Sequence, residues 1–376
     1  MGKTVILRRL FTEGSAAYAD LGTFLPLALG LIVLGGVDPV GLLYGFGIFA
    51  LATAAIYRRP IPVQPMKATA AMAVAGMIGP EVLVATGVLL GITLILLSQT
   101  ELTQRLKRLI PRTVLHGMRV ALALTLILNT VNLSAVSLPV IATLLGLLIA
   151  LQLTRLSSVS CLLLLLVGCA ALTEMPAVTG FFTQIYAPSF SLPELSAFAS
   201  ALEFAYLPQL ALTLTNALIL TAVIAQDYFP NEEKPVTERR LALSSGLANL
   251  LLAPIGAIPM CHGAGGLSAH YAMGSRSGWS IAVFGVTCLL LAALFGDQVT
   301  MLIAAVPAEV TLVLVLFAGW HLADPIRVAK VRPSCKLTIA GMTLVALWGG
   351  LMTALVTGVI LEWAISRYMQ TGSETN

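Results

Sequence analysis

Apolar segments separated by short turn or charge signals follow one another along almost the whole chain, and this succession limits the fold most strongly. Most are close to the roughly 20 residues that a helix needs to cross a bilayer. The chain is 58% apolar and 10% charged, which excludes a soluble domain attached to a single anchor. The expected segments are 14–34, 38–57, 62–79, 81–100, 112–131, 137–154, 158–175, 207–226, 239–254, 260–273, 277–296, 300–320, 335–349 and 351–367.

The basic residues indicate which loops face the cytoplasm. With the N-terminus inside, the loops on that side hold nearly all of the 21 basic residues, whereas the opposite loops hold only acids such as Glu81, Glu174 and Glu194. Only Lys67 and Arg119 fall well inside expected segments. We therefore expect a multi-pass protein of the cell (inner) membrane with both termini in the cytoplasm.

The two halves of the chain resemble each other. Ile61-Pro62-Val63-Gln64 recurs 197 residues later as Ile258-Pro259-Met260-Cys261, and Asp20 precedes Asn216 by 196 residues. Because seven segments is an odd number, a second copy would enter from the opposite side of the membrane, which predicts an inverted repeat. The alternative is that short Ile-Pro matches recur by chance in an apolar chain.

Segments 3 and 10 cannot cross the membrane as plain helices. Three prolines at 60–65 and two at 254–259 prevent regular helix, so each segment should be an extended stretch followed by a half-helix. Two opposed half-helix N-termini near the midplane would offer N–H groups and positive dipole ends to an anion. Gly263, Gly265 and Gly266 would let the anion approach the backbone, although such glycines also serve close helix packing.

The few polar residues inside segments are the remaining candidates, because burying them without a partner is unfavourable. Lys67 either carries charge for the substrate or pairs with Asp20, and Asp20 either carries a proton or partners Lys67. Gln209, Thr213 and Asn216 are spaced to share one helix face, which indicates either a site or interhelical hydrogen bonding.

Catalytic and cofactor chemistry is not indicated. Adjacent Cys261 and His262 would point about 100° apart on a helix, and no acid nearby orients the histidine, so we expect no enzyme. The five cysteines are scattered and form no disulfide framework or metal motif. No cofactor, metal or nucleic acid partner is expected. His116, Arg119 and Glu309 are interpreted as interfacial or inter-domain contacts, and His270 and His321 as packing.

Four stretches resemble the molybdate transporter family, relatives of the sulfate permeases that we expect to be unrelated to the MFS superfamily. They are 19–27, 60–68, 207–217 and 259–266. The resemblance implies an all-α membrane protein with about 14 transmembrane segments in two inverted repeats of seven, as in sulfate permeases and uracil permease. The cytoplasmic C-terminal domain typical of sulfate permeases does not follow Arg367, so we expect no dimerisation through it; a homodimer is an alternative to the monomer.

The resemblance also implies a division into a substrate-carrying core and a gate or scaffold. The expected parts are a core at 1–100 and 207–296, a gate at 101–175 and 297–367, an extracellular connector at 176–206 and a cytoplasmic tail at 368–376.

The function implied is secondary active import of a tetrahedral oxyanion, molybdate in the first place, by proton symport with alternating access and Asp20 as the proton-coupling candidate. Sulfate, bicarbonate or a nucleobase on the same fold, and an anion channel, are the alternatives; Phe24 would offer the aromatic surface for a nucleobase. The candidate substrate-binding residues are Thr23, Phe24, Gln64, Met66, Lys67, Gln209, Thr213, Asn216, Cys261, His262, Gly263, Ala264 and Gly265.

Overall fold

The computed structural model of the protein describes residues 12–99, 111–133, 136–154, 160–174, 185–230, 232–323 and 325–373. Within these residues the chain is mostly helical, and the helices follow the expected apolar segments. The basic cluster expected at 105–108 and the basic residue at 155 lie outside the described residues. Most of the first half of the expected connector lies outside them too.

The helices of the first half begin and end where local signals place them. Asp38 caps α3 (Pro39–Tyr57), because its carboxylate accepts hydrogen bonds from the N–H groups of Val40 and Gly41 at 3.3 and 2.9 Å. The helix ends at Arg58, whose φ of 54° is left-handed. The other long helices are α2 (Leu21–Val33), α5 (Pro80–Ser98), α7 (Arg112–Leu133), α8 (Leu138–Gln152) and α9 (Ser160–Leu172).

The second half starts with one continuous helical stretch, residues 195–228. It consists of α10 (Leu195–Ser200), π-helical η2 (Ala201–Ala205), α11 (Tyr206–Leu212), π-helical η3 (Thr213–Leu220) and α12 (Thr221–Tyr228). Pro208 has no N–H to donate, which interrupts the regular helical ladder near η2. The remaining helices are α13 (Glu238–Leu252), η4 (Ala253–Ile255), α15 (Trp279–Ala304), α16 (Ala308–Ala323), α17 (Pro325–Ala329) and α18 (Pro333–Ser373).

This stretch differs from the expected connector at 176–206, since residues 195–206 are helical and continue directly into the following span. Leu195–Ala205 contains mostly apolar residues and a single charge, Glu203, and such a sequence favours a helix over a polar loop even though several of its apolar side chains are exposed. The expected segment 300–320 is divided as well, because Pro307 separates the end of α15 from α16. A non-helical Gly350, with φ 82°, interrupts α18 between the last two expected segments.

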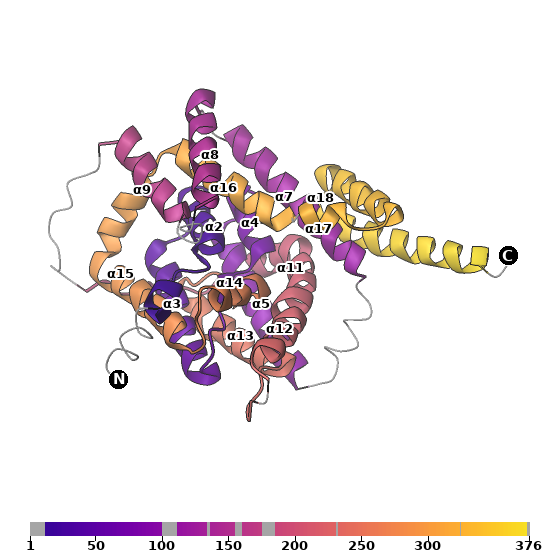
Figure 1. Ribbon diagram of the computed structural model, residues 1–376, viewed down its shortest axis with the longest axis horizontal. Coiled ribbons are helices and arrows are strands. Elements are labelled where there is room, and N and C mark those ends of the chain that lie inside the picture. Colours follow the sequence, from indigo (N-terminus) through magenta and orange to yellow (C-terminus); the bar gives the residue numbers. More distant parts are fainter. Residues whose placement is uncertain are drawn as a thin grey trace.

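Four helical stretches of the described chain are long and apolar enough to cross a membrane. They are Pro39–Tyr57, Pro80–Ser98, Leu195–Tyr228 and Trp279–Gly296. Shorter apolar helices surround them, and Figure 1 shows the two short helices α4 (Lys67–Val74) and α14 (Ala264–Ala272) in the middle of the bundle. The last turns of α18 project away from the bundle.

Each of these two short helices follows a three-residue strand. β1 (Val63–Pro65) and β2 (Met260–His262) pair antiparallel, with Gln64 opposite Cys261. The prolines prevent helix here, so the backbone groups must find partners elsewhere at membrane depth. Pairing the two strands with each other supplies part of those partners.

Side chains complete the hydrogen bonding around the strands. Asn249 of α13 donates from Nδ2 to the Met260 carbonyl and accepts the Met260 N–H at Oδ1, both at 2.7 Å. Nδ1 of His262 donates to the Pro62 carbonyl at 3.1 Å, and its Nε2 lies 2.8 Å from Oγ of Ser244. The irregular backbone is therefore buried in protein, and the ladder and these side chains supply hydrogen-bond partners to its polar groups.

Two helix pairs cross at glycines. A Cβ added at Gly91 of α5 would lie 3.0 Å from the carbonyl oxygen of Gly246 of α13, and one added at Gly246 would lie 2.9 Å from that of Gly91. The same reciprocal contact, at 3.0 Å each way, joins Gly47 of α3 and Gly285 of α15. Such close backbone approach is typical of membrane helix pairs, and it holds α3 to α15 and α5 to α13.

The buried carboxylate of Glu13 anchors the start of the described chain to the loop after α14. It accepts hydrogen bonds from the hydroxyls of Ser275 and Ser277 at 2.6 and 2.7 Å, and from the N–H groups of Arg276 and Ser277 at 3.1 Å each. Burial acts to raise the pKa of Glu13, but these four hydrogen bonds outweigh it and hold the pKa below its ordinary value of 4.5.

Candidate functional site

A cavity of about 220 Å³ lies where the short helices α4 and α14 meet α7 and the helical stretch 195–228. Its volume suits a small ligand better than a large cofactor. The lining residues are Gln64, Pro65, Lys67, Arg119, Gln209, Leu212, Thr213, Asn216, Ala217, Leu220, Ile224, Cys261, Ala264, Gly265 and Ser268.

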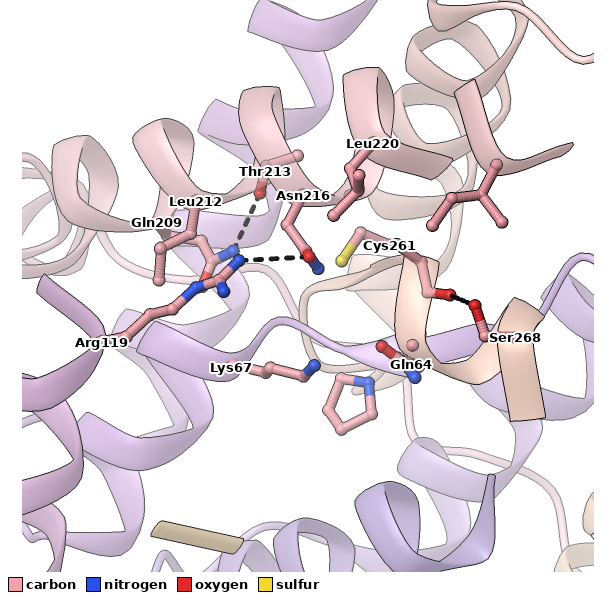
Figure 2. Close-up of a pocket in the computed structure, with 15 residues that line it drawn as sticks. Gln64, Lys67, Arg119, Gln209, Leu212, Thr213, Asn216, Leu220, Cys261 and Ser268 are labelled. Atoms are coloured by element: carbon pink, nitrogen blue, oxygen red, sulfur yellow. Dashed lines mark hydrogen bonds between the residues drawn. The ribbon is translucent and has the colours of Figure 1, made fainter. Parts of the chain in front are cut away.

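The charges at this cavity have one sign. Lys67 and Arg119 are the charged members of the described lining, and no acid is among them. Figure 2 shows both side chains extending from different helices toward the same space. Lys67 is the first residue of α4, and it interacts electrostatically with both Asp20 and Arg119. The cavity therefore attracts an anion.

Gln209 closes the N-terminus of α4. Its Oε1 accepts hydrogen bonds from the N–H groups of Ala68 and Thr69 at 2.8 and 3.2 Å, while its Nε2 donates to Oγ1 of Thr213 at 2.8 Å. Two of the N–H groups that begin α4 are thereby occupied. The predicted polar face of Gln209, Thr213 and Asn216 does line the cavity, with its first two members bonded to each other.

The N-terminus of α14 is open by contrast. No side chain caps it, and none of the hydrogen bonds among the described residues uses the N–H group of Ala264, Gly265 or Gly266. Ala264 and Gly265 line the cavity, and a Cβ added at Gly265 would meet nothing within 4 Å. These backbone donors can therefore reach a bound anion.

The three glycines of this turn have different surroundings. The space beside Gly263 is filled by Gln64, and the space beside Gly266 by Gln64 and Asp20. Only Gly265 is a member of the cavity lining. Glycine at 263 and 266 thus makes room for two polar side chains of the first half.

Asp20 lies next to the main cavity without lining it. Its carboxylate accepts a hydrogen bond from Nε2 of Gln64, which does line it. Asp20 borders a separate cavity of about 10 Å³ together with Phe24 and the buried His270. Gln64 therefore connects the acid with the anion-attracting space.

Several predicted site residues are committed elsewhere. Phe24 stacks edge-to-face on Phe46 and Phe284, with ring centroids 4.8 and 5.1 Å apart. Met66 was a candidate for substrate binding, but its N–H donates to the Pro259 carbonyl at 2.9 Å and is not available to a substrate. His262 is fully buried and fixes the strands. Thr23, Phe24, Met66, His262 and Gly263 do not line the cavity.

Arg119 is the charged lining residue whose place at the cavity the sequence did not predict. Its Nη2 donates to Oδ1 of Asn216 at 3.2 Å, which joins α7 to the helical stretch 195–228. The interpretation of Arg119 as an interfacial or inter-domain contact stays a prediction. The signal in the sequence that could have indicated this place is the charge of Arg119, since it is one of two basic residues well inside the expected segments.

Among the described residues, no group of three His, Cys, Asp or Glu side chains is placed to hold a metal ion.

The fold and this cavity define an integral, multi-pass membrane protein of the anion transporter class. The transmembrane domain of the cyanobacterial bicarbonate transporter BicA has a similar fold, with a TM-score of 0.68 at 15% identity over 96% of this chain and 98% of that one. The murine anion transporter Slc26a9 in its inward-facing state gives a TM-score of 0.66 at 10% identity, over 96% of this chain and 68% of that one.

The sequence identifies the family more closely. The profile of the family described as "Molybdate transporter of MFS superfamily" matches residues 12–126 and 200–322. Molybdate transporter 2 of Arabidopsis thaliana is 29% identical in an alignment 366 positions long, and the match covers 84% of this chain and 78% of that protein. The chain belongs to the molybdate transporter family, a family of transporters and not of enzymes. The predicted family is confirmed, whereas our separation of it from the MFS superfamily differs from that description.

Proposed function

We propose that the protein is a secondary active transporter that imports a tetrahedral oxyanion, molybdate in the first place, by proton symport. The observation that carries this proposal is the cavity in which the Lys67 side chain and the open N-terminus of α14 meet. A helix N-terminus and a cation together favour an anion strongly in a water-poor site.

The oxygens of the anion would accept hydrogen bonds from the N–H groups of Ala264 and Gly265 and from the Lys67 ammonium group. Gln64, Asn216 and the N–H of Lys67 would complete the shell, while Gln209 and Thr213 hold α4 in place. Cys261 would contact the anion from β2. Thr23 would act through its neighbour Asp20.

Alternating access would follow from two inverted repeats, with the core rocking against the gate. The reciprocal glycine contacts support this architecture: an operation that exchanges the halves would convert the α3–α15 pair into the α13–α5 pair. The antiparallel pairing of β1 with β2 has the same symmetry. We assign residues 1–100 and 207–296 to the core and 101–175 and 297–367 to the gate.

Import of a dianion needs coupling to a cation. Moving two negative charges inward against about 100 mV, inside negative, costs about 4.6 kcal/mol. A proton carried on Asp20 would lower this cost and reach the substrate through Gln64, with which Asp20 is hydrogen bonded. His270, which borders the same small cavity as Asp20, would be a route for that proton.

Molybdate is favoured over the alternatives by the name of the Arabidopsis relative. Sulfate has the same charge and shape, and bicarbonate is what BicA carries. A nucleobase is disfavoured, because Phe24 packs against two other rings and no acid is among the described residues that line the main cavity.

The segregation of basic residues to one set of loops supports a cell (inner) membrane location with both termini in the cytoplasm.

Uptake of labelled molybdate into proteoliposomes tests the proposal. At nanomolar molybdate with about a thousandfold excess of sulfate, uptake should persist and should increase when the outside is made acidic. Uptake that collapses with sulfate would indicate a general sulfate-type carrier. An uptake rate that does not change with an imposed pH gradient would exclude proton symport. A conductance far above the turnover of a carrier would indicate a channel.

A further inference from the structure

His270 of α14 has a buried ring nitrogen without a hydrogen-bond partner. Its side chain is 2% exposed, and its Nδ1 makes no hydrogen bond within the part of the chain that the structure describes. By contrast, both ring nitrogens of the buried His262 lie within hydrogen-bond distance of a partner. A buried polar atom of this kind costs free energy unless a water molecule or another ligand satisfies it. Nδ1 of His270 therefore indicates a bound ligand.

The small cavity beside His270 suits a single water molecule. Its volume of about 10 Å³ is close to the least that a water molecule needs. Asp20 and His270 are the ionisable members of its described lining, and the other members are apolar: Ala17, Leu21, Phe24, Pro62, Val63, Ile281 and Phe284. A water molecule in this cavity would find its polar partners in the Asp20 carboxylate and Nδ1 of His270, and it would connect them.

Asp20 lies between this small cavity and the larger one. Its carboxylate accepts a hydrogen bond from Gln64, which lines the larger cavity. Polar groups also continue beyond His270, because the Ser275 N–H donates to the His270 carbonyl at 3.0 Å. The Ser275 hydroxyl in turn donates to the carboxylate of Glu13 at 2.6 Å. This second series of groups leads to the loop after α14, and none of them lines the larger cavity.

We propose that the small cavity is a proton-transfer site, in which one bound water molecule passes a proton from Asp20 to Nδ1 of His270. This inference rests on the proposed function, because it concerns the proton of that symport. Protonated Asp20 gives its proton to the water while the water gives another to Nδ1 of the neutral ring, so a carboxylate and an imidazolium form and the water is regenerated. The proton then leaves toward the loop after α14, whereas the anion leaves from the larger cavity.

Two assays in proteoliposomes separate the path of the proton from the path of the anion. Net uptake of labelled molybdate, driven by an acidic outside, requires that the proton be released inside. Exchange of labelled for unlabelled molybdate at equal pH carries the anion in both directions with the proton retained. A block in proton transfer should therefore slow net uptake and leave exchange intact.

His270→Gln keeps a polar side chain but cannot take up a proton. Net uptake should fall at least about tenfold, while exchange should stay within about threefold of wild type. His116→Gln is the matched control, since His116 of α7 is not among the described lining residues of either cavity, and both of its rates should stay within about threefold. Equal loss of both rates in His270→Gln, or loss of neither, would overturn the proposal.

Ala17→Val tests the water molecule itself. The larger side chain fills the small cavity and leaves both ionisable groups in place, so net uptake should again fall while exchange persists. Ala17→Gly leaves room for the water, and its net uptake should stay near that of wild type. Unchanged net uptake in Ala17→Val would overturn the water site.

Thermal unfolding in detergent checks that each variant folds, and Ala17→Val decides the outcome if His270→Gln does not fold. Failure of the proposed function gives a different result from failure of this inference. Wild-type uptake that an acidic outside does not accelerate would remove proton symport itself. Accelerated uptake in wild type that persists in His270→Gln would remove only the transfer through His270.

Discussion

The segments β1–α4 and β2–α14 each consist of a short strand followed by a short helix, but only the first of the two helices has its N-terminus capped by a side chain. Gln209 caps the start of α4, whereas α14 follows Gly263 without a side-chain cap, and no hydrogen bond among the described residues uses its first N–H groups. The charged side chain stands on the capped helix, since Lys67 begins α4. The two halves have thus specialised: one supplies a cation and the other supplies backbone donors.

This division has a physical reason. A lysine at the positive end of a helix dipole is unfavourable unless negative charge lies near it. The partly negative Gln209 carbonyl oxygen accepts the first N–H groups of α4, and the Asp20 carboxylate attracts the lysine electrostatically. The glycine turn at α14 needs no such compensation, and it admits an anion close to the backbone. Predictions that alter one half and not the other can break this comparison.

The largest effect is expected at Lys67. Lys67→Ala removes the charge on the capped helix and should abolish high-affinity anion binding, with a loss of about a hundredfold or more. Proteoliposome uptake and anion-induced thermal shift both measure this loss. Lys234→Ala is the control, since Lys234 is exposed in a loop. Unchanged affinity in Lys67→Ala would show that α14 binds the anion alone.

Gly265→Ala and Gly266→Ala compare two neighbouring positions of α14. A methyl group at 266 would collide with Asp20 and Gln64, so Gly266→Ala should destabilise the protein by about 2 kcal/mol. A methyl group at 265 meets nothing within 4 Å, so stability should be unaffected while anion affinity falls. Thermal unfolding in detergent measures the difference. Equal destabilisation by both changes would contradict the assigned surroundings of these glycines.

Gln209→Leu tests the cap of α4. The change leaves the N–H groups of Ala68 and Thr69 without their acceptor in a buried place, which should lower stability by about 1–3 kcal/mol. Ser268→Ala is a matched change near the start of α14, where the Ser268 hydroxyl donates to the Ala264 carbonyl at 3.1 Å, and its effect should be smaller. A larger loss in Ser268→Ala would reverse the comparison.

The smallest effect is expected at the far end of α14, where Glu13 binds the following loop. Because its pKa is depressed in the folded protein, Glu13 contributes stability that is fully present above its unfolded pKa of about 4.5 and is lost as the pH falls through the folded value. Glu13→Gln should therefore make the free energy of unfolding depend less on pH from about pH 6 down to below about pH 4. A profile identical to wild type would exclude this contribution.

The sequence predicted most of the helices because apolar runs, prolines and caps act locally. Asp38 and Pro39 begin α3, and the prolines of 60–65 force an extended stretch, whatever the rest of the chain does. The helical part of the expected connector was missed, because its first turns mix exposed apolar and polar residues without a clear period. Gln64 lines the cavity and His262 does not. The sequence could not separate them, because the place of each depends on neighbours about 200 positions away along the chain.

The sequence by itself determined a multi-pass helical protein with two proline-broken segments and a lysine at the start of the first half-helix, because these features depend on composition and short-range backbone chemistry. Its resemblance to the molybdate transporter family came from four short stretches of sequence. Only the tertiary structure decided that Gln209 caps α4, that α14 stays open and that Arg119 enters the cavity from α7. The reason is that hydrogen-bond occupancy and cavity lining depend on how distant segments pack. The spacing of residues within one segment does not predict which distant segments it contacts.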